Sequence, residues 1–121
     1  MSATKVNFSA SESDVSCFKY EQELYKTILN NQLGRHHTIT RNLNQFAIKI
    51  QSYEQGTPQA DLHRSQQNLI TEIEEHKKTW DDFTLQILPY YSEKHYKMLL
   101  RISKEIGQFR SQYNALVARI Q

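Results

Sequence analysis

The sequence predicts an all-α chain, either a long antiparallel helical hairpin or a three-helix bundle with coiled-coil seams. Apolar residues recur in alternating steps of about three and four residues, which is the spacing of a heptad seam. Turn-forming residues break this spacing near Gly56 and at Pro89. Because only 38% of the residues are hydrophobic, an elongated bundle with narrow seams suits this composition better than a compact globule.

The first helix is predicted over about residues 11–55. Its heptad frame passes through Gly34 without a shift, so we expect one continuous helix although glycine costs about 1 kcal/mol relative to alanine. Residues 1–10 are rich in Ser, Thr, Ala and Asn and are predicted to be a disordered lead-in. The apolar seam positions of this helix are Phe18, Tyr25, Leu29, Ile39, Leu43, Phe46, Ile50 and Tyr53.

The second helix is predicted over about residues 58–88. Gly56 supplies a helix stop, Thr57 an N-cap and Pro58 a first helical residue, which together predict a tight helical hairpin. The seam positions are Leu62, Leu69, Ile73, Trp80, Phe83 and Ile87.

The third helix is predicted over about residues 91–121, after Pro89. If Pro89 opens into a turn, the three helices fold into one up-down-up bundle; if it only kinks the chain, the second and third helices form one rod. In the rod, the seam of the third helix is bare and must find another chain. Either way, residues 11–121 form a single helical domain.

Charge and composition exclude several classes of protein. The net charge of +2 gives no general case for nucleic acid, although residues 57–89 carry about −3 and residues 90–121 about +4. The single cysteine, Cys17, excludes an internal disulfide and a cysteine-based zinc site, and no apolar run approaches the roughly 18 residues of a membrane span. No secretory signal is visible, so we expect an intracellular protein of the cytoplasm or nucleus.

The histidines do not form a metal-binding pattern. His36 and His37 are adjacent, so on a helix they point about 100° apart, and neither has a ligating residue one turn away. His36 instead falls in the seam, where a polar residue fixes register at some cost in stability. His76 also falls in a seam, without the Glu–His spacing of a di-iron bundle.

Catalytic motifs are also missing, because the sequence contains no phosphate-binding loop and no nucleophile motif. Four carboxylates are spaced for the solvated outer face of the second helix: Glu74, Glu75, Asp81 and Asp82. We therefore predict no catalytic residue, no metal and no cofactor, and a protein that is not an enzyme.

A partner-binding surface is predicted on the third helix, because no capping glycine closes its apolar run. We expect this seam to dock another coiled-coil protein or a second copy of the chain. Its residues are Leu99, Ile102, Ile106, Phe109, Tyr113, Leu116 and Ile120. Trp80 is predicted to be a core residue, with an interface hot spot as the alternative.

A basic stripe on the third helix is a candidate anion-binding site, with nucleic acid or an anionic membrane as the partner. Its spacing aligns four cations along one side of the helix. The alternatives are a solvated flank of the seam or ion pairing with an acidic helix such as the second. The four residues are Lys94, Lys97, Arg101 and Lys104.

The pentapeptide Phe18–Gln22 opens a long polar helix, and Lys78-Thr79-Trp80 follows about sixty residues later in another heptad helix. In these features residues 18–120 resemble the N-terminal region of a coiled-coil protein of the synaptonemal complex central element. In size and texture the chain is also similar to small helical kinetochore subunits. Both resemblances imply a helical subunit that co-assembles with other helical chains.

Overall fold

The computed structural model confirms an all-α fold. It describes residues 12–87 and 93–121, with side chains from residues 23–87 and 96–121. The described part contains α1 (Glu12–Glu54), α2 (Leu62–Ile87) and α3 (Glu93–Ala118). The predicted lead-in over residues 1–10 and the break at Pro89 lie outside the described residues.

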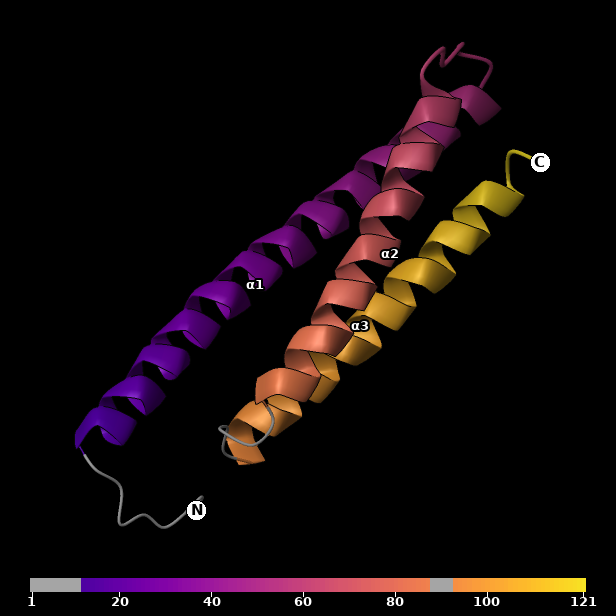
Figure 1. Ribbon diagram of the computed structural model, residues 1–121. Helices are drawn as coiled ribbons and strands as arrows, with labels where there is room; N and C mark the ends of the chain where they lie inside the picture. Colours follow the sequence, from indigo (N-terminus) through magenta and orange to yellow (C-terminus); the bar gives the residue numbers. More distant parts are fainter. Residues whose placement is uncertain (1–11, 88–92) are drawn as a thin grey trace.

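The three helices form one bundle, and the rod is not observed (Figure 1). α1 and α2 make an antiparallel hairpin, and α3 runs back along both of them. At one end Arg119, the residue after α3, pairs with Glu54, the last residue of α1. The seam of α3 is therefore covered within the chain.

α1 is continuous through Gly34, as predicted, and spans 43 residues. It ends in a Schellman motif at Gly56, whose φ of 92° requires the left-handed region that glycine adopts readily. The Thr57 N–H donates to the Ser52 carbonyl at 2.9 Å, and the Gly56 N–H donates to the Tyr53 carbonyl at 3.0 Å. The predicted helix stop is confirmed.

α2 begins at Leu62, four residues later than predicted, so the prediction of Thr57 as N-cap is wrong. Asp61 occupies the N-cap position, because its carbonyl accepts the Ser65 N–H at 2.9 Å. Its carboxylate lies 2.7 Å from Lys49 Nζ of α1, which lowers the pKa of Asp61 and ties the start of α2 to the first helix.

The core follows the predicted seams from Ile39 onward, but the predicted seam position Tyr53 is wrong, because its side chain is 49% exposed. The predicted seam position Phe18 lies outside the residues whose side chains are described. Near the end of α3, however, Val117 is buried while Leu116 and Ile120 are only partly buried. An α-helix of about 3.6 residues per turn drifts against a strict heptad, which explains the change from position 116 to 117. The buried apolar residues are Ile39, Leu43, Phe46, Ile50, Leu62, Leu69, Ile73, Trp80, Phe83, Ile87, Leu99, Ile102, Ile106, Phe109, Tyr113 and Val117.

Candidate functional site

The seam predicted to dock a partner lies inside the bundle, which corrects the sequence-based assignment. Five of its residues are buried, and the other two, Leu116 and Ile120, pack against the core. Phe109 contacts the ring of His36 at 4.6 Å between centroids, and Tyr113 stacks on Phe46 at 6.3 Å. α1 therefore supplies the surface that was expected from a second chain. The five buried residues are Leu99, Ile102, Ile106, Phe109 and Tyr113.

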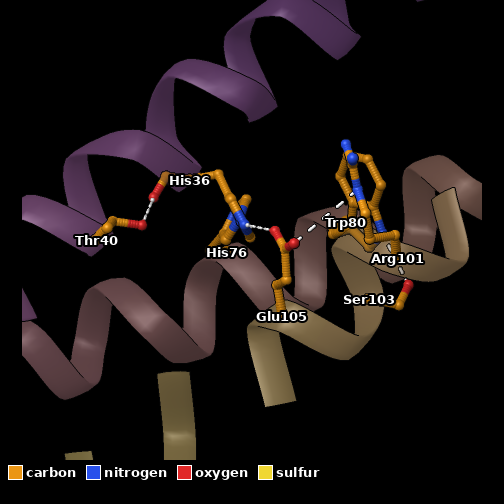
Figure 2. A network of polar contacts seen from close by, with 7 residues as sticks. All are labelled: His36, Thr40, His76, Trp80, Arg101, Ser103 and Glu105. Carbon is orange, nitrogen blue, oxygen red and sulfur yellow. Dashed lines mark hydrogen bonds and ion pairs between the residues drawn. The ribbon is translucent and has the colours of Figure 1, made fainter. Parts of the chain in front are cut away.

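Trp80 is a core residue in this fold. Its side chain has no exposed surface, and its indole Nε1–H donates to Ser103 Oγ of α3 at 2.9 Å (Figure 2). The ring also packs against Phe83, with centroids 5.8 Å apart. An indole that finds a hydrogen-bond partner can be buried fully without an unsatisfied donor. Trp80 thus joins α2 to α3 and is not available on the surface as a hot spot.

A buried polar cluster joins all three helices beside Trp80 (Figure 2). His36 Nδ1 of α1 lies 3.0 Å from His76 Nε2 of α2, and His36 Nε2 lies 2.9 Å from Glu105 Oε1 of α3. His76 Nδ1 lies 3.1 Å from Gln32 Oε1 of α1. We call His36, His76, Glu105 and Gln32 the histidine cluster. The burial of His36 and His76 and their mutual contact confirm that both histidines occupy seam positions.

The donors and acceptors restrict where the protons of the histidine cluster lie. Gln32 Oε1 is an acceptor, so His76 donates Nδ1–H to it and keeps Nε2 as an acceptor for the Nδ1–H of His36. The second nitrogen of His36 faces a carboxylate oxygen of Glu105.

Burial lowers the pKa of His76 from its ordinary value of 6.5 to about 4. Desolvation is the main cause, and the neighbouring His36 and Arg35 add repulsion of a positive charge. His76 is therefore neutral near pH 7, which agrees with its role as an acceptor from His36. The histidine cluster thus connects α1 to α2 and α3 through contacts in which His76 carries no charge.

The histidine cluster is not arranged as a metal site. His76 and Glu105 contact opposite nitrogens of the His36 ring, so one ion cannot bind all three groups in this arrangement. Within residues 12–87 and 93–121 no group of three His, Cys, Asp or Glu side chains could hold a metal ion. The geometry supports helix pairing and offers no reacting centre.

The basic stripe keeps its place on the outer side of α3. Lys97, Arg101 and Lys104 are exposed, whereas the side chain of Lys94 lies outside the described part. Arg101 Nε approaches Glu105 Oε2 at 4.0 Å on the same helix. Arg110, further along α3, forms an ion pair with α2, and its Nη1 lies 3.3 Å from Glu74 Oε2.

A surface at the α2–α3 edge combines exposed apolar and charged side chains. The exposed fractions are 73% for Leu85, 51% for Leu100 and 42% for Tyr96. Asp81 lies one turn before Leu85 on α2, and Lys104 lies one turn after Leu100 on α3. Both charged side chains are exposed. We call Leu85, Asp81, Tyr96, Leu100 and Lys104 the α2–α3 outer face.

Two cross-helix contacts indicate that these residues lie at neighbouring levels of the two helices. Glu74 reaches α3 through Arg110, and Asp81 lies two turns along from Glu74 on the same side of α2. Ser103 reaches α2 through Trp80, and Leu100 lies one turn before Ser103. The two contacts set an antiparallel register that brings Leu85 level with Leu100.

A hollow lies between α1 and α2, with a volume of about 510 Å³. Its lining is mainly amide, hydroxyl and charged, and the contacts of Asn42 with Glu72 at 3.0 Å and of Lys49 with Ser65 at 2.8 Å occupy several of these groups. Lys49 donates both to Ser65 and to Asp61, at 2.7 Å, so the hydroxyl–amine contact in this hollow is part of an ion pair between α1 and the start of α2.

Sequence reasoning missed that Gln32, His36 and His76 meet. Each of these polar residues falls on a seam position, and buried polar groups need partners, so their mutual pairing was open to prediction. Glu105 lies just outside the seam, and only the packing of α3 on α1 brings it to His36.

No helix in the described part of the chain is long and apolar enough to cross a membrane. Comparison of the chain with known protein families, curated proteins and solved structures gave no match.

Proposed function

We propose that this chain is a non-enzymatic assembly subunit whose closed three-helix bundle docks onto other helical chains through the α2–α3 outer face. The observation that carries the proposal is the exposure of Leu85, Leu100 and Tyr96 side by side. Scattered exposed apolar residues are ordinary, but a group of them rimmed by charges is typical of an interaction surface.

The burial of the α3 seam is the reason for proposing the α2–α3 outer face as the docking surface in place of that seam. Since α1 and α2 already cover Ile106 and its neighbours, a partner that used them would have to open the core. The resemblance to central-element and kinetochore subunits implies the same class of protein, an intracellular helical subunit that co-assembles.

A pair of matched variants tests the proposal. Leu85→Glu with Leu100→Glu charges the α2–α3 outer face, whereas Ile48→Glu charges a single exposed apolar residue on α1 that is 62% exposed. Affinity capture from the source cells should recover the same helical partners with the wild type and with Ile48→Glu, and lose them with the double variant. Equal capture by all three proteins would contradict the assignment of the surface.

A second candidate function is binding of nucleic acid or an anionic membrane through the basic stripe. The observation in its favour is that Lys97, Arg101 and Lys104 are exposed on one helix beside Tyr96. Such binding weakens steeply with salt, because each neutralised phosphate releases counterions. Titration with single-stranded DNA and with phosphatidylserine vesicles, at low and at physiological salt, checks it. Affinity that does not change with salt would rule it out.

A further inference from the structure

We propose that a second copy of this chain occupies the α2–α3 outer face, in a dimer whose twofold axis runs parallel to the helices. The inference rests on the proposed function, because it names the partner of that surface. It is carried by the pattern of apolar and charged residues on two helices that lie side by side.

The α2–α3 outer face carries the same order of side chains on both helices. Leu85 lies level with Leu100, from the register set by Trp80–Ser103 and Glu74–Arg110. One turn further toward the C-terminal end of α3, Asp81 lies level with Lys104. Each helix thus has an apolar residue followed by a charge, and the two charges are opposite in sign.

A twofold axis parallel to the helices makes this surface complementary to itself. It lays α2 of one chain over α3 of the other at the same level, so Leu85 meets the partner's Leu100 and Asp81 meets the partner's Lys104. The symmetry forms both contacts twice, as in an isologous interface. A twofold axis across the helices, at the level of Leu85, would leave much of each face uncovered.

The bundle leaves this face open for a partner. α1 packs against the opposite side of α2, where Thr79 contacts Gln32 at 3.2 Å and Glu72 contacts Asn42 at 3.0 Å. Asp81 already lies 2.7 Å from Lys77 Nζ on its own helix. This exposed pair is weak, and a carboxylate can accept from a second lysine through its other oxygen.

Reciprocal charge reversal tests the arrangement. In a dimer of Asp81→Lys chains, lysine faces lysine at both contacts, and in a dimer of Lys104→Glu chains, carboxylate faces carboxylate. An equimolar mixture of the two variants restores an opposite pair at both contacts. We expect a dissociation constant at least about tenfold weaker for each variant alone and near the wild-type value for the mixture.

Analytical ultracentrifugation over a concentration series measures these states, with circular dichroism to confirm that each variant is folded. The wild type should reach twice the 14.3 kDa mass of one chain, and so should the mixture. A wild type that stays monomeric up to millimolar concentration would overturn the proposal. If the charge reversals left the dissociation constant unchanged but Leu85→Glu with Leu100→Glu abolished the dimer, the parallel arrangement would be overturned.

Different results would contradict the docking surface and the second copy as its occupant. If the wild type is monomeric but the Leu85→Glu, Leu100→Glu variant still loses partners that Ile48→Glu retains, the second copy is wrong and the docking surface stands. If the chain neither self-associates nor loses a partner on charging this face, both are wrong.

Discussion

Acid should destabilise this bundle through His76, whose folded pKa of about 4 lies well below the ordinary 6.5. Between these two pH values the unfolded chain binds a proton at this histidine and the folded chain does not. Acid therefore stabilises the unfolded state relative to the folded state. The stability present above pH 6.5 is therefore lost as the pH falls, and the loss is complete near pH 4. At about 1.4 kcal/mol per pKa unit, acidification from pH 7.5 to 4.5 costs about 2.5 kcal/mol from this residue alone.

His76→Gln isolates this effect, because a glutamine amide can accept from His36 and donate toward Gln32 without titrating. His63→Gln is the matched control, since His63 is an exposed histidine on the same helix. Urea unfolding followed by the fluorescence of Trp80, the only tryptophan, gives the free energy of unfolding at each pH. Apart from the one histidine replaced in each variant, the three proteins have the same titrating groups, so the contributions of those groups largely cancel in the comparison.

The expected result is that His76→Gln removes about 2.5 kcal/mol of the pH dependence, more than His63→Gln does at its exposed site. If the wild type and His76→Gln lost the same stability between pH 7.5 and 4.5, His76 would not be held neutral by the fold. The account of the histidine cluster would then be refuted.

Three further predictions concern stability. Trp80→Ala should lower the free energy of unfolding by about 3–5 kcal/mol, because it leaves a cavity between α2 and α3. Leu99→Asp with Ile106→Asp should unfold the chain and not merely block association, because both side chains are in the core. Gly56→Ala should cost about 1–2 kcal/mol, because a φ of 92° strains an L-residue. Urea unfolding followed by circular dichroism measures all three.

Each of these predictions has a control or a contradicting result. Trp80→Phe keeps most of the ring and should cost less than Trp80→Ala, so equal losses would argue against a filled core. A folded, monomeric Leu99→Asp, Ile106→Asp protein would mean that α3 packs elsewhere. Gly34→Ala has open space and lies inside a helix, so it should stabilise by about 0.5–1 kcal/mol. The same sign for Gly34→Ala and Gly56→Ala would contradict the local geometry.

Periodicity predicted the elements of this fold well because burial imposes it directly. The seam residues Ile39, Leu43, Phe46 and Ile50 fall on the core side of α1 in the expected frame. Gly34 does not break the helix. The stop at Gly56 followed from the residue type that adopts a positive φ most readily. The start of α2 was misplaced because Thr57–Pro58 is a strong local signal, yet Asp61 provides an N-cap that also pairs with Lys49.

The site was harder to predict, because a seam specifies a covering surface without saying which chain supplies it. Ile106 and Phe109 have the same spacing whether α1 or another protein covers them. Only the reversal of direction between α2 and α3 decides this, and Pro89 is compatible with both outcomes. The α2–α3 outer face was invisible for the same reason, since Leu85 and Leu100 become neighbours only when the two helices lie side by side.

The central claim is that α3 folds back along α1, and one distance tests it most directly. Glu54 and Arg119 form an exposed ion pair at the shared end of the bundle, so both can be replaced by cysteine in a Cys17→Ser chain and spin-labelled. Electron–electron distance measurements, with labelled protein diluted in unlabelled protein, then report on single chains. The closed bundle predicts about 10–25 Å between the labels, whereas in an extended rod α2 and α3, at about 39 Å each, would hold them about 60 Å or more apart. The shorter distance would support the bundle, and the longer one would show that the seam of α3 is open to another chain.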